Sequence, residues 1–262
     1  MQKITITFIA CLILLTNNIM AQSEEPILGR LKIGVELGSH YMNSNMETPS
    51  QVRQANLYYD KYDSYRRLGY YYRNVINATY FTLKPEYQLT ERFSVASGFR
   101  LSFYKDQFDA NYNYFLWQIK GDQNNTNYLK IARIEQTVYK LGIPLEFRLY
   151  PRRRDHFVRQ YFLVGAMFNF ATFTNTDIDT YNEFAYRYED SVKETLTRPD
   201  NFSSFYYAGI GLKIGKAGYP SANFEVLFPM VSFGEYMISS FSKSSGTGVI
   251  GIATSLKIPI AL

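Results

Sequence analysis

The chain contains few of the side chains that perform catalysis. It has two histidines, His40 and His156, and a single cysteine, Cys11. Ser39 stands directly before His40, and a hydroxyl beside a histidine base is a pairing that hydrolases use. Adjacent residues of a regular strand point to opposite faces, so these two side chains cannot share the required hydrogen bond. The sequence therefore predicts no catalytic residue and a protein that is not an enzyme.

Side chains that could hold a metal or a cofactor are equally scarce. The two histidines are far apart, which leaves only carboxylates as ligands. The pairs Asp60/Asp63 and Asp177/Asp179 do not have the spacing of an EF-hand loop. The glycine-containing segment 209–218 has neither the Lys-Ser pair nor the strand-to-helix context of a phosphate-binding loop. We expect no metal and no cofactor, and we interpret these acids as solvated loop residues.

The charged residues that carry information lie in segments that alternate with period two. In Val138–Pro151, VYKLGIPLEFRLYP, apolar residues occupy the odd positions, and Lys140, Glu146 and Arg148 stand between them. Such alternation predicts a β-strand with one apolar and one polar face. Seven further segments show it: Leu31–Ser39, Thr79–Leu89, Phe93–Phe103, Tyr161–Phe170, Ser204–Ile214, Asn223–Phe228 and Ile250–Leu262. In a soluble sandwich the apolar face would form the core, whereas in a membrane barrel it would face lipid.

The lengths of the connections distinguish these two folds. The links 90–92, 151–159 and 216–221 are short, and they alternate with the long links 41–77, 105–135, 171–203 and 234–247. Short turns at one rim and long loops at the other are typical of outer-membrane barrels. The predicted fold is all-β: an eight-stranded antiparallel transmembrane β-barrel with short periplasmic turns and long extracellular loops, located in the bacterial outer membrane.

In such a barrel the polar face of each strand lines the lumen. Eight strands leave an interior only just wide enough for side chains to fill. We therefore expect a packed polar lumen network, with a gated ion path as the alternative. Its predicted members are Lys32, Glu36, Lys84, Glu86, Arg100, Lys140, Glu146, Arg148, Lys213, Glu225 and Lys257.

Four prolines interrupt these strands. Pro85, Pro144, Pro229 and Pro259 each remove a hydrogen-bond donor from the ladder between strands. We expect each to lie at a bulge or at a strand end, and a bulge would exchange the inner and outer faces beyond it.

The first residues predict export from the cytoplasm. Lys3 is followed by the apolar run 4–15, polar residues and the small Ala21, which is the order of a secretory signal peptide. We expect a signal peptide over 1–21, a short periplasmic segment over 22–30 and the outer-membrane barrel over 31–262. Cys11 lies within the apolar run rather than after it, which argues against a lipoprotein. The formal net charge of +5 comes without a basic block, so we expect no nucleic-acid partner.

The long segment Leu57–Asn74 is rich in tyrosine and arginine. Tyrosine offers a large contact area at low entropic cost, and arginine binds carboxylates and phosphates. This composition suggests a surface-binding loop, although aromatic strand extensions above the membrane would have the same composition. Its candidate binding residues are Tyr58, Tyr59, Tyr62, Tyr65, Arg66, Arg67, Tyr70, Tyr71, Tyr72 and Arg73. At the other rim, the turn around His156 is either solvated or in contact with a periplasmic partner or an anionic headgroup.

The segments 83–103, 141–151, 161–170 and 251–262, including LGIPLEFRLYP and GIATSLKIPIAL, resemble outer-membrane barrels of Bacteroidetes-type bacteria, among them the PorT-like small barrels. The resemblance implies an eight-stranded barrel, and some of these relatives are accessory parts of a protein-secretion machinery. We therefore expect a surface binding or structural barrel, or an accessory subunit of an envelope complex. A small pore or a lipid-modifying enzyme is a further alternative. The expected partners are outer-membrane lipid, lipopolysaccharide and an envelope protein.

Overall fold

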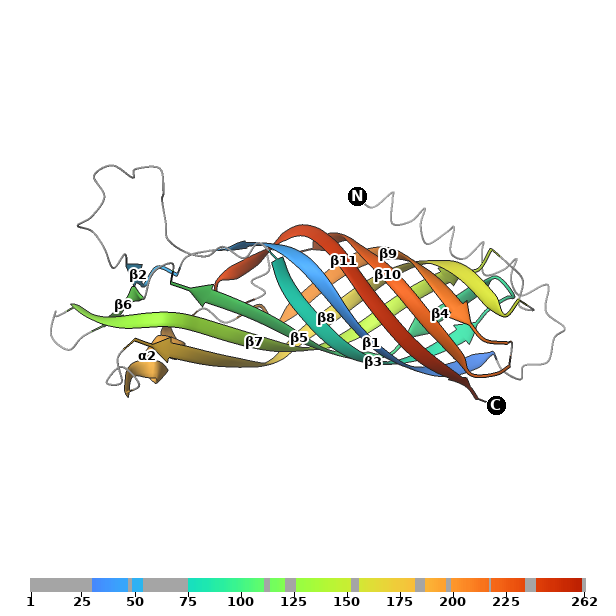
Figure 1. The fold of residues 1–262 in the computed structure, drawn as a ribbon, viewed down its shortest axis with the longest axis horizontal. Helices are drawn as coiled ribbons and strands as arrows, with labels where there is room; N and C mark the ends of the chain where they lie inside the picture. The colour runs from blue at the N-terminus through green and yellow to red at the C-terminus, as the bar shows by residue number, and fades with distance from the viewer. Residues whose placement is uncertain are drawn as a thin grey trace.

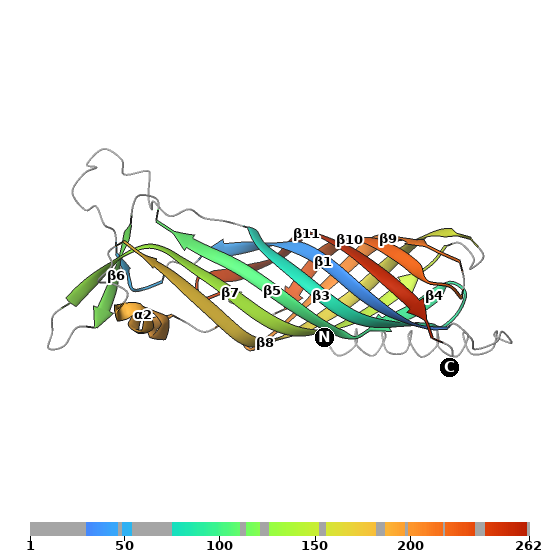
Figure 2. The same cartoon turned by 60° about the horizontal axis from the view of Figure 1, so that its bottom comes forward.

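The computed structural model describes residues 30–46, 49–53, 75–110, 114–120, 126–151, 156–181, 187–196, 199–216, 218–233 and 239–260. Eight hydrogen-bonded strands form a closed ring, which Figures 1 and 2 show from two sides. One position in the ring is shared by two strands, β4 (Phe93–Ser97) and β5 (Phe99–Asp109), which are separated at Gly98. The other positions are β1 (Leu31–Met46), β3 (Val75–Gln88), β7 (Thr126–Leu149), β8 (Val158–Thr180), β9 (Phe202–Ile214), β10 (Ser221–Phe233) and β11 (Ser242–Pro259).

Neighbouring strands of the ring are antiparallel throughout. β1 pairs with β3 on one side and with β11 on the other, so the first and last strands close the barrel. At this seam Lys32 lies opposite both Glu86 and Pro259. The predicted eight-stranded antiparallel barrel is therefore confirmed.

The two faces of each strand differ in the way that a membrane-spanning barrel requires. On β7, Leu145 is 39% exposed on the outside and its neighbour Glu146 is 0% exposed inside. Leu37, Phe99, Phe162 and other large apolar side chains cover the outside of the ring. Water would penalise such a surface, whereas lipid accepts it, and the closed ring leaves no edge unpaired in hydrocarbon. The chain is thus an outer-membrane barrel.

Two of the four strand prolines lie where they were expected. Pro229 lies at a shift of register between β10 and β9, and Pro259 is the last residue of β11. Pro85 and Pro144 instead remain in regular register with β1 and β8, respectively. Pro85 on β3 and Pro144 on β7 lie on either side of Gly98, the residue at which β4 ends and β5 begins. Gly98 has a φ of +150°, and a Cβ there would lie 2.0 Å from the carbonyl oxygen of Leu83, so only glycine fits at this break.

The predicted long loops are in large part strands. β7 and β8 extend beyond most of the other strands of the ring, toward β2 (Val52–Arg53) and α2 (Glu189–Thr195) (Figure 1), and the segment expected to be the loop 105–135 also contains β6 (Phe115–Lys120). Register shifts lie between Ile131 and Arg133 on β7 and beside Thr172 on β8. Each shift exchanges the inner and outer faces of its strand. The period-two alternation is therefore interrupted there, and the sequence pattern does not show that the strand continues. A smaller correction concerns the predicted turn 151–159, because β8 already begins at Val158.

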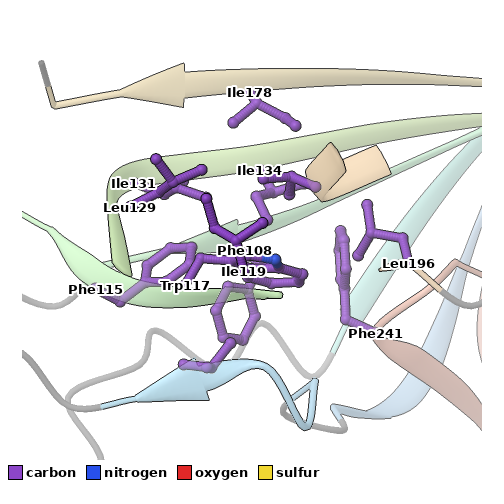
Figure 3. Packing of buried hydrophobic residues seen from close by; sticks show 12 residues of the cluster. Phe108, Phe115, Trp117, Ile119, Leu129, Ile131, Ile134, Ile178, Leu196 and Phe241 are labelled. Carbon is purple, nitrogen blue, oxygen red and sulfur yellow. The ribbon is translucent and has the colours of Figure 1, made fainter. Parts of the chain in front are cut away.

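These extensions carry a small domain that we call the extracellular head. It consists of β2 (Val52–Arg53), β6, the ends of β7 and β8 beyond the register shifts, and α2 (Glu189–Thr195). It lies at the opposite end of the barrel from the short turns (Figure 2). The head packs around an apolar core to which β5, the adjoining part of β7 and the segment before β11 also contribute (Figure 3). The core consists of Val52, Phe108, Phe115, Trp117, Ile119, Leu129, Ile131, Ile134, Ile178, Val192, Leu196 and Phe241.

Several predicted segments fall outside the described residues. These are the signal peptide and nearly all of the periplasmic segment, the tyrosine-rich loop with its ten candidate residues, and positions 152–155 of the turn around His156. Among the described residues, no helix has the length and apolar character needed to cross a membrane.

Candidate functional site

The structure brings the predicted lumen residues together inside the barrel. All eleven side chains are buried. Their four carboxylates, on Glu36, Glu86, Glu146 and Glu225, come from β1, β3, β7 and β10 and lie among the lysines and arginines. Hydrogen bonds to charged groups are among the strongest in proteins, and in a dry interior an unpaired charge is very costly. The four acids form one electrostatic unit with Lys84, Arg100, Arg148, Lys213 and Lys257, whereas Lys140 donates to the Ser203 hydroxyl at 3.3 Å.

Glu146 lies at the middle of this unit. Its carboxylate accepts hydrogen bonds from Lys84 Nζ at 2.8 Å, Arg148 Nη2 at 2.6 Å and the hydroxyl of Tyr207 at 2.8 Å. Lys84 also contacts Glu36 and thereby joins β1 to β7 through β3. Two charged partners and one phenol thus hold an acid that is completely removed from solvent.

A second cluster surrounds Glu86 toward the periplasmic turns. Arg148 Nη1 lies 3.0 Å from Glu86, and Lys257 contacts the same carboxylate. The hydroxyls of Ser94 and Tyr150 donate to its other oxygen at 2.7 and 2.9 Å. Lys257 is on the last strand, so this cluster ties the end of the chain to β3 and β7.

The remaining two acids extend the network around the barrel wall. Glu225 accepts hydrogen bonds from Arg148 at 2.7 Å and from the Tyr161 hydroxyl at 2.6 Å. Glu36 lies 3.0 Å from Arg100 Nη2. The guanidinium of Arg100 also lies 3.7 Å from the centre of the Tyr80 ring, which is a favourable stacking contact. Arg148 thereby connects three of the four acids.

Tyrosines were not predicted as members of the network, although they complete it. Tyr80 on β3 lies directly opposite Gly38 on β1, and Tyr161 on β8 lies directly opposite Gly211 on β9. A Cβ at either glycine would lie 2.3 Å from the facing ring. Each ring thus lies over a glycine of the adjacent strand, and Tyr207 covers Gly165 in the same manner. The sequence did contain a signal for these rings. Glycines occur among the charged residues on the polar faces of the strands, and each leaves room for a large side chain from the neighbouring strand.

One further cation enters the lumen from the segment predicted as a turn. Arg159 is buried on β8 opposite Lys213 on β9, with its guanidinium 4.7 Å from the Tyr150 ring. With Arg159, the buried lysines and arginines of the described residues number eight, against five buried acids including Asp106. The described interior therefore has a formal excess of three positive charges, and any ion path through it would favour anions.

A second set of contacts lies at the extracellular mouth of the barrel, beyond the lumen network. The Ser239 hydroxyl donates to Asp106 at 2.5 Å, and Gln136 exchanges hydrogen bonds with Ser240 at 2.9 and 2.7 Å. The next residue, Phe241, packs in the core of the head (Figure 3). The segment before β11 is thus held over the mouth by polar contacts on one side and apolar contacts on the other.

His40 lies in the lumen, where it packs against aromatic rings. Its ring centre is 5.6 to 5.7 Å from the rings of Tyr80, Tyr104 and Phe205, and Nε2 lies 3.4 Å from the Tyr104 hydroxyl. Ser39 is on the opposite face of β1, as the alternation requires. In the described part of the chain, no group of three or more histidine, cysteine or acidic residues is arranged to hold a metal ion.

Comparison with known proteins gives remote structural likenesses. No family model and no curated protein matches the chain. The outer membrane protein OprG of Pseudomonas aeruginosa is 12% identical with a TM-score of 0.43, covering 91% of this chain and 100% of its own. The N-terminal β-barrel domain of Pseudomonas aeruginosa OprF is 9% identical with a TM-score of 0.35, covering 88% and 99%.

A third likeness is to Ail, the attachment invasion locus protein of Yersinia pestis, solved in complex with the heparin analogue sucrose octasulfate. It is 10% identical with a TM-score of 0.33, covering 87% of this chain and 99% of its own. At this level of similarity the three structures carry no inference about ligands or partners.

Proposed function

We propose that the protein is a non-enzymatic outer-membrane barrel that acts through its extracellular head, as a surface binding or structural protein. The observation that carries the proposal is the filling of the barrel at two levels. The lumen network occupies the interior, and the segment 239–242 covers the mouth. The head has an apolar core that holds it in one shape outside the membrane, so it is the part suited to recognition.

Conductance in planar lipid bilayers tests the closed lumen. We expect the purified protein to give no stable large channels, because charged side chains and tyrosines fill the lumen that the ring of strands encloses. Stable conductance steps would contradict the proposal and favour a small pore. Their selectivity would then be informative, since the positive excess inside the barrel predicts a preference for anions.

An accessory role in an envelope or protein-secretion complex, as in the PorT-like barrels, is the alternative. The exposed cations Arg92 and Lys216 and the exposed imidazole of His156 at the periplasmic turns favour it, because they offer a polar, positively charged surface to a periplasmic partner. A photo-crosslinking residue at Tyr128 on the head or at Lys216 on a turn separates the two roles in intact cells. Adducts from position 128 alone support the proposal, whereas a protein adduct from position 216 alone supports the alternative.

A further inference from the structure

The outward face of the head carries a cluster of two tyrosines and a lysine. Tyr114 precedes β6, Lys130 is on β7, and Tyr181 follows β8. The rings of Tyr114 and Tyr181 are 4.9 Å apart between centres, and Lys130 Nζ lies 4.7 Å from the centre of the Tyr114 ring. Tyr181 is 48% exposed. We call these three residues the tyrosine–lysine cluster.

The cluster is held in place by the core behind it. Phe115 and Ile131, which neighbour Tyr114 and Lys130 in sequence, lie opposite each other in the β6–β7 pairing and point into the apolar core (Figure 3). The backbone N–H of Tyr181 donates to the carbonyl of Lys130 at 2.9 Å. The cluster is therefore preorganised, which lowers the entropic cost of binding a ligand.

Lys130 differs from the other cations on this face of the barrel. Lys105 Nζ lies 2.6 Å from Glu135, and Arg133 Nε lies 2.7 Å from Asp109. Within the described parts of the chain, Lys130 makes no ion pair and contacts the Tyr114 ring. Of these three described cations, Lys130 is thus the one whose ammonium group makes no ion pair with a described residue and lies beside the Tyr114 ring.

The position of the cluster above the membrane indicates its neighbour. The outside of β7 faces lipid at Leu141 and reaches an aromatic girdle at Tyr139, whose ring contacts those of Phe103 and Phe173. Lys130 is nine residues farther along the same strand, or about 30 Å at ~3.3 Å per residue. At a strand tilt of about 40° this is a height of roughly 20 Å above the girdle. In an outer membrane the sugars of lipopolysaccharide occupy that layer.

We propose that Tyr114, Lys130 and Tyr181 bind the phosphorylated core saccharide of the lipopolysaccharide that surrounds the barrel. The exposed tyrosine ring offers an apolar face to the C–H face of a sugar ring and a hydroxyl to its edge. The lysine ammonium offers a point charge to a phosphate or carboxylate of the same saccharide. This inference rests on the proposed function, because it assigns one ligand class to one face of the head.

Binding of a deacylated lipopolysaccharide oligosaccharide tests the proposal. This probe retains the core sugars and their phosphates but has no acyl chains, so it cannot enter the membrane. The full-length protein in lipid nanodiscs is fixed to a sensor surface, and affinity is measured for the wild type, Lys130→Gln and Tyr181→Ala. Lys105→Gln is the matched control, because it removes an exposed cation of β5 from the outside of the barrel, below the head. Emission from Trp117, the single tryptophan, reports that the core of the head remains packed.

We expect the oligosaccharide to bind the wild type, and each cluster variant to weaken binding by about two- to tenfold. Lys105→Gln should change the affinity less than twofold. Absence of binding, or equal weakening by all three variants, would overturn the proposal. Complete displacement by equimolar inorganic phosphate would also overturn it, because the site would then recognise phosphate without sugar. The conductance test of the closed lumen does not depend on any of these results. The proposed function can therefore hold even if this inference about the ligand is wrong.

Discussion

The substitution Glu146→Gln tests whether the lumen network stabilises the barrel. It preserves the volume of the side chain and the hydrogen bond from Tyr207 at 2.8 Å. It removes the negative charge that faces Lys84 Nζ at 2.8 Å and Arg148 Nη2 at 2.6 Å. Both cations are as fully buried as the acid, so water cannot replace the lost partner.

Removing one partner of a buried ion pair costs about 3–5 kcal/mol, because the other charge is left in a medium that solvates it poorly. Lys84 retains Glu36, and Arg148 retains Glu86 and Glu225. We therefore expect the lower end of that range, about 3 kcal/mol of the free energy of unfolding. The matched control is Glu135→Gln, whose carboxylate is partly exposed and lies 2.6 Å from the Nζ of the largely exposed Lys105. That change should cost about 0–1 kcal/mol.

Urea unfolding in lipid vesicles measures both values, with the far-ultraviolet circular dichroism of the barrel as the signal. A double-mutant cycle with Lys84→Met then isolates the coupling between Lys84 and Glu146. If Glu146→Gln costs no more than Glu135→Gln, the network fills space without holding the strands together, and the electrostatic argument is wrong.

Three further substitutions probe the other parts of the molecule. Leu145→Arg places a charge near the middle of the lipid-facing surface and should cost about 2–4 kcal/mol in vesicles; a cost near zero would mean that this face does not meet lipid. Gly211→Ala should destabilise the barrel by about 1–3 kcal/mol, because the new Cβ would lie 2.3 Å from the Tyr161 ring. Adding Tyr161→Phe should not relieve that clash, whereas Tyr161→Ala should, and thermal melts of the two double variants decide between them. Phe241→Ala should cost the head about 3–5 kcal/mol and shift the emission of Trp117 to the red, while the barrel still migrates as a folded band in gels; unchanged emission would show that Phe241 is not part of that core.

The barrel itself was predictable from sequence because each strand faces two uniform environments. Lipid on one side and a polar lumen on the other enforce strict alternation, so Leu145 and Glu146 were placed on the correct faces from period two alone. The same alternation placed all eleven charged residues inside. It also brought His40 inward and kept Ser39 away from it.

The partners of these charges were not predictable in the same way. Arg148 meets acids from β3, β7 and β10, and these contacts depend on strand register and on the diameter of the closed ring. The tyrosines of the lumen were missed because tyrosine suits the membrane interface as well as a polar interior. Only the cross-strand register shows that Tyr161 lies over Gly211 and Tyr207 over Gly165.

The extracellular head is the part of the molecule that the sequence alone did not predict. Local alternation determined the eight strands and their two faces, because those properties depend on the environment of one strand at a time, and the alternation of short and long connections identified the membrane barrel. The register shifts near Ala132 and Thr172 exchange the faces of β7 and β8, so a uniform pattern predicted loops where the strands continue. The core around Trp117 and Phe241 joins residues more than a hundred positions apart. Such contacts depend on the closed ring and on the extended strands that place these segments side by side, and therefore only the tertiary structure decided them.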